Sequence, residues 1–546
     1  MKPIYLFALF LFALSTQAQK FDEKLTEQLD QQLARYVEEG DPGLAVGVIQ
    51  NGQTVYQRYL GYADLNHGIK IDAQTRFNIA SNAKQFTALC ILQLNEQGKL
   101  QLDDDIRKYL PDLYPNIEQP ITISQLLNHT SGIRDVYDLW ALTGKTWWKS
   151  FVDNDDAIAL ISAQQELNFP PGTARIYSNS NYILLTAIVK KIIGEAFEEV
   201  SNALFAQLDM PSTGFQTDYM AVVPHKARPY GNWGTWKEFP SITETHGDGA
   251  LFTTLEDQLQ WEKILQQNDG KYLSKTLLAQ TQSPVANTTA PNSGFGVDFG
   301  TYRDMKYTYH DGSTGAYKAT FLRFTEKNLS IVLLTNNWNV PPHYLAQQLA
   351  DLMFGLDKQQ YPTQPNKVEK LADFKMLVGS YQNEAGDIIR IVEKEGALVR
   401  EMYRYEPEKI INEKGGWYRF EGNNQQSLNF IDVGTPEQTL ISYSIYHDPV
   451  AYQKLPATND RKNCVQTDLV GNYYNPETET KIEIQFVEDY TFAITKNGRE
   501  RKGKLELNDF IRMNSYHITA VRDADGQVIG LKVNNGRIQN VIFERI

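Results

Sequence analysis

The sequence predicts an α+β domain built on one antiparallel sheet, followed by two small antiparallel β-barrels. Strand-like runs stand near both ends of the first domain, and mainly helical patterns fill residues 77 to about 280, so strands far apart in sequence must meet in one sheet. Beyond residue 370 the hydrophobic period changes from mostly helical to two. There "MLVGSYQN" at Met376 recurs as "DLVGNYYN" at Asp468, and each copy opens roughly eight short strand-like runs.

The first twenty residues, "MKPIYLFALFLFALSTQAQK", predict a secretory signal peptide over residues 1–18. They combine a basic start, an apolar run too short for a bilayer span, and a small-residue site ending at Ala18. We therefore expect a secreted or periplasmic protein with no stable membrane anchor after signal removal. The formal net charge of -13 argues against a nucleic-acid partner.

The elements of the first domain, residues 19–356, follow in order. Residues 21–40 form an amphipathic helix pattern that ends at Gly40. Two alternating runs around Asn51-Gly52 predict a β-hairpin. After the helical region, "MKYTYHDG", "AYKATFLRF" and "NLSIVLLTN" predict three strands, and "PPHYLAQQLADLMFGL" predicts a closing helix.

Polar, Pro-bearing residues 357–370 predict a linker. The repeat then assigns one barrel to residues 371–460 and a second to residues 461–546, both of the small up-and-down type found in lipocalins. One larger composite barrel is the alternative. The two cysteines, Cys90 and Cys464, are expected to be unpaired, and Cys90 lies in an apolar helix.

Ser81 and Lys84, in "FNIASNAKQFTALCILQL", lie three residues apart and share one face of an apolar helix. A serine hydroxyl needs a base to become a nucleophile, and burial favours the neutral form of a lysine, which could serve as that base. The spacing alone is a weak signal. A serine that caps the helix, followed by a lysine that reaches solvent, is the alternative.

Two further segments favour the catalytic interpretation. Tyr177-Ser178-Asn179 stands in a polar loop before an apolar helical run. A tyrosine near the lysine could relay a proton, and Asn179 could orient a substrate or hold the lysine. His310-Asp311-Gly312 ends a strand and leads through Ser313 into a Gly loop. A glycine there allows close approach, and backbone N–H groups along that edge could stabilise an oxyanion.

With these three motifs in this order, the chain resembles the serine β-lactamase and penicillin-recognising family, specifically its class C-like branch of peptidases and esterases (the peptidase S12 type). The resemblance covers about residues 40–355. It implies a β-lactamase/transpeptidase-like fold with a helical insertion and an acyl-enzyme mechanism on Ser81. Lys84 and Tyr177 would be the general-base pair, Asn179 would orient the substrate, and the N–H groups of Ser81 and Ser313 would form the oxyanion hole. Tyr177 would also serve as the base in deacylation.

His310 departs from the lysine that many β-lactamases and carboxypeptidases of this family carry. A histidine is neutral for about half the time near pH 6.5, so it suits a substrate carboxylate less well. The resemblance then points to D-aminopeptidase- or esterase-like cleavage of an amide or ester in a small molecule or peptide. A β-lactamase or D-Ala-D-Ala carboxypeptidase is one alternative, and a non-catalytic peptidoglycan- or peptide-binding protein is another.

The remaining candidates are interpreted structurally. His129 and His246 are expected to shape loops, and tryptophans near residues 140–148 and 233–236 to pack the helical insertion, although they could line an acyl pocket. No metal-binding spacing and no nucleotide-binding glycine loop is found, so we expect no metal and no cofactor. The acyl and leaving groups and the oligomeric state stay open.

Overall fold

The structure is a computed structural model. It describes residues 23–239, 241–286, 288–356, 374–383, 386–401, 407–412, 417–421, 426–444 and 450–546. The predicted signal peptide, residues 1–18, and the predicted linker, residues 357–370, lie outside the described residues. Within the described ranges, no helix combines the length and the apolar character needed to cross a bilayer.

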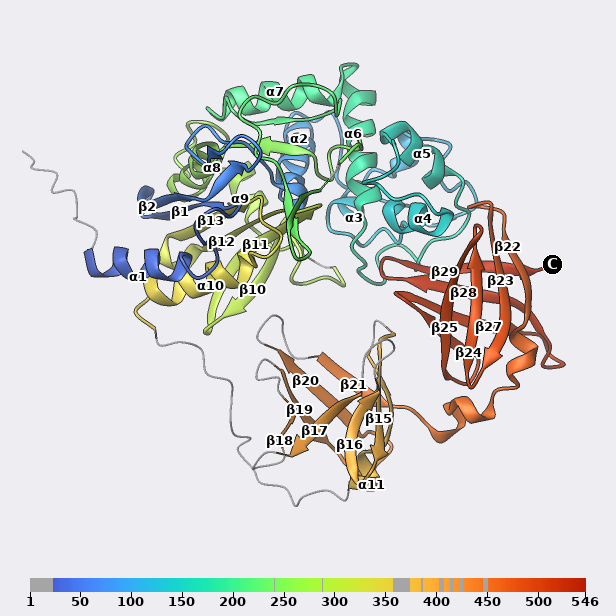
Figure 1. The fold of residues 1–546 in the computed structure, drawn as a ribbon. Helices are drawn as coiled ribbons and strands as arrows, with labels where there is room; N and C mark the ends of the chain where they lie inside the picture. The colour runs from blue at the N-terminus through green and yellow to red at the C-terminus, as the bar shows by residue number, and fades with distance from the viewer. Residues whose placement is uncertain are drawn as a thin grey trace, which may run out of the picture.

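A six-stranded antiparallel sheet forms the centre of the first domain (Figure 1). Its strand order is β10-β11-β12-β13-β1-β2. The strands are β1 Leu44–Gln50, β2 Gln53–Leu60, β10 Asp298–Tyr302, β11 Met305–Thr314, β12 Tyr317–Phe324 and β13 Leu329–Thr335. β1 pairs with β13 from Leu44↔Thr335 to Gln50↔Leu329, which joins the two ends of the domain as predicted. β10 is an addition to the prediction, because "DFGTY" is short and contains a glycine.

Helices cover both faces of this sheet. α1 (Glu23–Leu33) and α10 (Pro342–Met353) pack on one face, and α8 (Leu255–Gln267) packs against β1 and β13 on the other. Behind α8, α2 (Lys84–Glu96) contacts α6 (Asn179–Ile193), α7 (Phe197–Gln207) and α9 (Lys275–Thr281). The helical layer also contains α3 Ile123–Leu127, α4 Val136–Thr143 and α5 Asn154–Ser162. The short strands are β3 Tyr62–Asp64, β4 Ile69–Lys70, β5 Phe77–Asn78, β6 Gly214–Phe215, β7 Tyr230–Asn232, β8 Trp236–Glu238 and β9 Leu251–Thr253.

Two separate closed barrels follow, each with eight antiparallel strands in sequence order, so the composite-barrel alternative is wrong. α11 (Phe374–Leu377) precedes the first. The first barrel contains β14 Gly379–Gln382, β15 Ile388–Lys394, β16 Ala397–Glu401, β17 Glu408–Asn412, β18 Trp417–Phe420, β19 Gln426–Ile431, β20 Thr439–Ser444 and β21 Val450–Lys454. The second contains β22 Gly471–Asn475, β23 Thr480–Glu488, β24 Thr491–Lys496, β25 Arg499–Leu507, β26 Phe510–Met513, β27 Tyr516–Arg522, β28 Val528–Asn535 and β29 Ile538–Arg545.

The sequence repeat places a buried tyrosine at the start of each barrel. Tyr381 and Tyr473 are both fully buried. Their hydroxyls donate to the carbonyl oxygens of Leu377 at 2.8 Å and Leu469 at 3.0 Å. Each bond satisfies a buried phenol while the ring packs in the barrel core, which explains why "LVGxY" occurs in both copies.

The second barrel lies against α4 of the first domain (Figure 1). Leu139 and Leu142 of α4 are fully buried and belong to the same apolar cluster as the barrel interior. Lys496 donates to the carbonyl oxygens of Ala141 at 2.6 Å and Leu142 at 2.9 Å, so it binds the carboxyl end of α4, where a cation is favourable. Apolar packing and these charge-assisted bonds therefore hold the barrel beside the helical layer.

Candidate active site

Ser81 lies in a short 3₁₀ turn, Ala80–Ala83, that leads directly into α2. Ala80 before it has φ of 48°, in the left-handed region that costs a non-glycine residue about 1–3 kcal/mol. The Asn78 side chain accepts from the Ala80 backbone N–H at 2.9 Å and helps to hold this turn. The strained turn places the Ser81 side chain, which is partly exposed, at the base of a cavity.

Lys84 is fully buried, which rules out the solvent-reaching alternative. Its ammonium donates to the Ser81 hydroxyl oxygen at 3.2 Å, to Asn179 Oδ1 at 2.8 Å and to the Asp248 carbonyl oxygen at 2.5 Å. Burial lowers the pKa of Lys84 to about 8, against an opposing effect of nearby carboxylates. When the amine is neutral, two N–H groups can keep the Asn179 and Asp248 bonds while the lone pair faces Ser81.

The Tyr177 ring packs against the Lys84 ammonium. Its centroid is 5.0 Å from Lys84 Nζ, and the Ser81 side chain is near enough to the Tyr177 hydroxyl to oppose part of the rise in the Tyr177 pKa. Burial raises the pKa of Tyr177 above its ordinary value, so the phenol is protonated near neutral pH. A protonated phenol can pass a proton along a chain but is a poor base by itself, which alters the role expected from the sequence.

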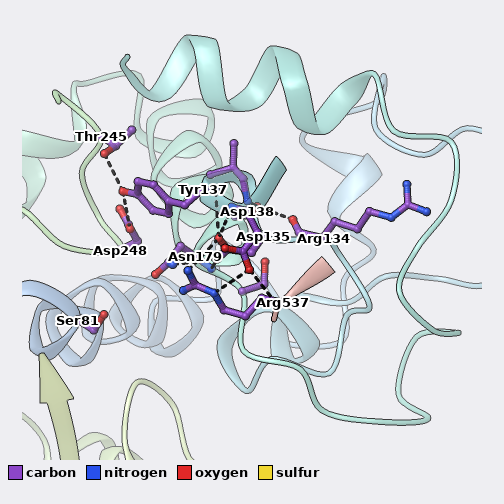
Figure 2. Close-up of polar contacts among 12 residues, drawn as sticks. Ser81, Arg134, Asp135, Tyr137, Asp138, Asn179, Thr245, Asp248 and Arg537 are labelled. Carbon is purple, nitrogen blue, oxygen red and sulfur yellow. Dashed lines mark hydrogen bonds and ion pairs between the residues drawn. The ribbon is translucent and has the colours of Figure 1, made fainter. Parts of the chain in front are cut away.

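Asn179 is the first residue of α6 and connects Lys84 to a buried carboxylate. Its Nδ2 donates to Asp135 Oδ2 at 2.8 Å, and its backbone N–H donates to the same oxygen at 2.7 Å. Asp135 is fully buried and caps α4, accepting from the Tyr137 backbone N–H at 3.0 Å. These bonds fix the amide so that Oδ1 accepts from Lys84. Figure 2 shows Asn179 beside Asp135 and Arg537.

Gly312 brings β11 into close contact with the segment before Ser81. A Cβ on this residue would lie 2.1 Å from the Ile79 carbonyl oxygen, so only glycine fits. His310, two residues earlier on β11, is buried, and burial lowers its pKa. Ser313 follows Gly312 and lines the same cavity as Ser81. The His310 ring lies beside that of Tyr177, with centroids 6.3 Å apart. The structure thus brings the seven predicted residues together, although of these Ser81, Asn179 and Ser313 line the cavity and the other four lie behind its wall.

The cavity above Ser81 has a volume of about 150 Å³. Its lining contains Asn78, Ala80, Ser81, Tyr137, Trp147, Asn179, Gln216, Ser241, Thr243, Thr245, Asp248, Gly249, Ala250, Ser313, Thr314 and Arg537. Of the tryptophans considered from the sequence, Trp147 lines this cavity and Trp140 is buried in the core. A pocket of this size and polarity fits a small group next to a scissile carbonyl.

His129 supports the loop that carries Tyr177. Its ring lies 4.3 Å from the Tyr177 ring, and its Nδ1 accepts from the Ser178 backbone N–H at 3.2 Å. Burial lowers the pKa of His129, so the imidazole is neutral. These contacts agree with the loop-shaping interpretation. His246 lies with its Nδ1 3.0 Å from the Glu244 carbonyl oxygen and its ring stacked on Phe197, with centroids 6.1 Å apart.

Three polar residues of the site were not predicted: Asp135, Asp248 and Arg537. Asp135 precedes the apolar run "VYDLWAL", and that N-cap pattern could have identified it as a helix start. Burial raises the pKa of Asp248, whose Oδ2 accepts from the Tyr137 hydroxyl at 3.0 Å. Arg537 comes from the turn between β28 and β29, and no local pattern relates it to a site 456 residues earlier at Ser81.

The fold and this cluster define an enzyme class in which a serine and a lysine one helical turn apart face a glycine-containing strand. The Beta-lactamase family model matches residues 22–352. The chain belongs to this family, and family and fold together indicate a serine hydrolase.

The known proteins that resemble the chain cover different shares of its length. Protein flp of Staphylococcus aureus (strain N315) is 30% identical over 324 residues, which are 57% of this chain and 63% of flp. The chain thus spans less than two thirds of the length of that relative. The octameric penicillin-binding protein homologue from Pyrococcus abyssi has a TM-score of 0.55 and 18% identity, covering 95% of this chain and 99% of its own.

Two further solved structures share the fold of the first domain. EstCE1, a hydrolase with promiscuous acyltransferase activity, has a TM-score of 0.52 and 22% identity, covering 61% of this chain and 98% of its own. The D-amino acid amidase from Ochrobactrum anthropi SV3, complexed with L-phenylalanine amide, has a TM-score of 0.51 and 21% identity, covering 61% and 99%. These likenesses establish the fold of the domain.

Proposed function

We propose that the protein is an exported serine hydrolase that cleaves an amide or ester through an acyl-enzyme on Ser81. One observation carries the proposal: a fully buried Lys84, with its pKa lowered to about 8, lies 3.2 Å from the Ser81 hydroxyl oxygen. At pH 7 about one lysine in ten is then neutral, far more than at the reference pKa. Export is supported by the signal-peptide pattern of residues 1–18.

In acylation, neutral Lys84 takes the Ser81 proton as Oγ attacks the carbonyl carbon of the substrate. The negative charge that develops on the carbonyl oxygen is stabilised by the backbone N–H groups of Ser81 and Ser313. The proton passes from Lys84 through the Tyr177 hydroxyl to the leaving nitrogen or oxygen as the bond to it breaks. Water then attacks the acyl carbon, and its proton returns along the same route, which restores Ser81.

Tyr177 acts here as a proton relay with Lys84 as the base, because burial keeps the phenol protonated. Asn179 holds Lys84 Nζ toward Ser81 through a 2.8 Å hydrogen bond. The orientation of its amide is fixed, because Nδ2 donates to Asp135. In this proposal Lys84, Tyr177 and Asn179 thus have separate tasks.

The buried, neutral His310 favours an amide or ester substrate without a carboxylate at this position, such as a D-aminoacyl amide or a short-chain ester. A permanent cation there would favour a carboxylate-bearing substrate such as a penicillin. Amidase and hydrolase neighbours on the same fold support this proposal by analogy. The substrate class is therefore a small molecule or a peptide with a small acyl group.

The test compares hydrolysis of p-nitrophenyl butyrate and D-alanine p-nitroanilide by the mature chain and by Ser81→Ala. Turnover of the anilide that is lost in the variant supports a D-aminopeptidase-like amidase, and turnover of the ester alone supports an esterase. Nitrocefin is the third substrate, and steady turnover of it would favour the β-lactamase alternative. Equal behaviour of wild type and Ser81→Ala on every substrate would refute the hydrolase proposal in favour of a binding protein.

A further inference from the structure

The second barrel contributes a charged side chain to the cavity above Ser81. Arg537 lies in the turn between β28 and β29, and it lines this cavity together with Ser81 and Asn179. Its guanidinium carbon is 5.9 Å from the centre of the Tyr177 ring, and its side chain is 35% exposed. A residue from another domain is thus part of the wall of the proposed active site.

Arg537 contacts the carboxylate that holds Asn179. Its guanidinium lies 3.4 Å from Asp135 Oδ1 and 3.4 Å from Asp138 Oδ2 (Figure 2). The opposite oxygen of Asp135 accepts both N–H groups of Asn179, and Asn179 Oδ1 accepts from Lys84. One continuous path of polar contacts therefore leads from the barrel turn to the base of the proposed reaction.

The turn that carries Arg537 is held in place by its neighbours. The Arg537 backbone N–H donates to Asp138 Oδ2 at 2.8 Å, and its carbonyl accepts from Asn168 Nδ2 at 3.0 Å. Arg134, almost fully buried, pairs with Glu477 of the barrel at 2.9 Å and donates to the carbonyl of Asn540 at 3.1 Å. Together with the packing of the barrel on α4, these contacts fix the position of the turn beside the cavity.

A fully buried carboxylate needs a counter-charge or several hydrogen bonds to stay ionised. Asp135 accepts from backbone N–H groups of α4 and of Asn179. Among the described residues, the one cationic group within salt-bridge distance of it is the Arg537 guanidinium. If a neutral residue replaced Arg537, Asp135 would lose this counter-charge, and we expect its hydrogen bonds to Asn179 to be weakened or rearranged.

We propose that Arg537 is a positioning residue that the second barrel supplies to the hydrolase site: it pairs with buried Asp135 and so keeps Asn179 against Lys84. The inference rests on the proposed function of Lys84 as the base. It means that the site is complete only when the barrel is docked, so that the barrel is part of the catalytic unit. Arg537 itself does not contact the reacting atoms.

The charge of Arg537 also favours the neutral form of Lys84, in addition to its effect on the position of Asn179. The titratable and charged groups that face Lys84 are Asp135, Asp248, Arg537, Tyr177, Tyr182, His129 and His310. The two carboxyl groups raise the pKa of Lys84, whereas Arg537 lowers it. Loss of the guanidinium would leave Lys84 protonated to a higher pH, and the rate in the acid limb would fall about tenfold for each unit by which its pKa rises.

The experiment uses the full mature chain with Arg537→Met, Arg537→Lys and the matched control Arg501→Met, at an exposed residue of β25 in the same barrel. The pH dependence of the acylation burst with p-nitrophenyl butyrate is measured for each. We expect Arg537→Met to lower the burst rate at pH 7 at least tenfold and to move its acid limb to higher pH, with KM little changed. Arg537→Lys should restore much of the rate, and Arg501→Met should leave the acid limb in place.

An unchanged acid limb in Arg537→Met would overturn the inference. So would a rise in KM confined to substrates with a carboxylate, because Arg537 would then bind substrate instead of positioning Asn179. A readout without turnover is the thermal unfolding of Arg537→Met, Asp135→Asn and the double variant: coupling is expected, and additive effects would also overturn the inference. Equal hydrolysis by wild type and Ser81→Ala would instead refute the proposed function, while the unfolding cycle still tests the pair.

Discussion

Replacing Gly312 by alanine should move β11 away from the segment that carries Ser81. The added Cβ would lie 2.1 Å from the Ile79 carbonyl oxygen. A carbon–oxygen contact needs about 3.3 Å, so the two backbones must separate by about 1 Å. Neither partner is the flexible end of a side chain. Because Gly312 and Ser313 are neighbours in the ladder with β12, paired with Ala319 and Lys318, the movement reaches Ser313.

A displacement of about 1 Å in an active site can lower the rate about a hundredfold, which corresponds to about 2.7 kcal/mol of transition-state stabilisation. If Ser81 and Ser313 donate to the oxyanion, Gly312→Ala should lower kcat/KM by about that factor. The matched control is Gly249→Ala, at the same cavity. A Cβ on Gly249 would meet Ala80 at 3.7 Å, an ordinary contact, so this variant should stay within a few-fold of wild type.

The assay is steady-state hydrolysis of p-nitrophenyl butyrate by both variants, with circular dichroism and thermal unfolding to verify that each is folded. The reasoning is refuted if folded Gly312→Ala retains wild-type kcat/KM, or if Gly249→Ala loses as much activity as Gly312→Ala. In either case, the approach of β11 to Ser81 would not control the reaction rate.

Three more predictions follow from the same structure. The rate should rise with pH through about 8, because the lowered pKa of Lys84 means that deprotonation produces the base; a pH–rate profile flat from 6 to 9 would contradict this. Lys84→Arg should lower kcat by about 10²–10⁴, since arginine stays charged, whereas exposed Lys99→Arg should have no effect in the same hydrolysis assay. Leu142→Ala should weaken barrel docking by about 2–5 kcal/mol, seen as faster hydrogen exchange in α4; exposed Val222→Ala is the control, and unchanged exchange would show that Leu142 does not hold the barrel.

Much of the fold follows from local pattern. The β1–β2 hairpin was predicted from the Asn51-Gly52 pair between two alternating runs, and in the structure both residues take the positive φ that such a turn needs. The two barrels were predicted from the repeat of "LVGxY" and the period-two pattern, and the structure shows that the tyrosine of each copy bonds to the carbonyl oxygen four residues earlier. Ser81 and Lys84 could be paired from the sequence alone, since one helical turn fixes their distance.

Features that depend on contacts between distant segments escaped the prediction. The turn with Arg537 has the sequence of an ordinary hairpin end, and its role comes from how the second barrel docks on α4. Asp135 is recognisable as a helix cap, but its bonds to Asn179 depend on how α4 and α6 pack. The protonation of Tyr177 likewise depends on burial, which its loop sequence does not indicate.

Mass spectrometry of the acyl-enzyme tests the central claim most directly. The mature chain is mixed with excess p-nitrophenyl butyrate, quenched within seconds, and its intact mass and peptides are measured. We predict one butyryl group per chain on the peptide that contains Ser81, no adduct in Ser81→Ala, and much slower labelling in Lys84→Arg. Hydrolysis at the wild-type rate by Ser81→Ala, or an adduct on another residue with Ser81 unmodified, would contradict the account.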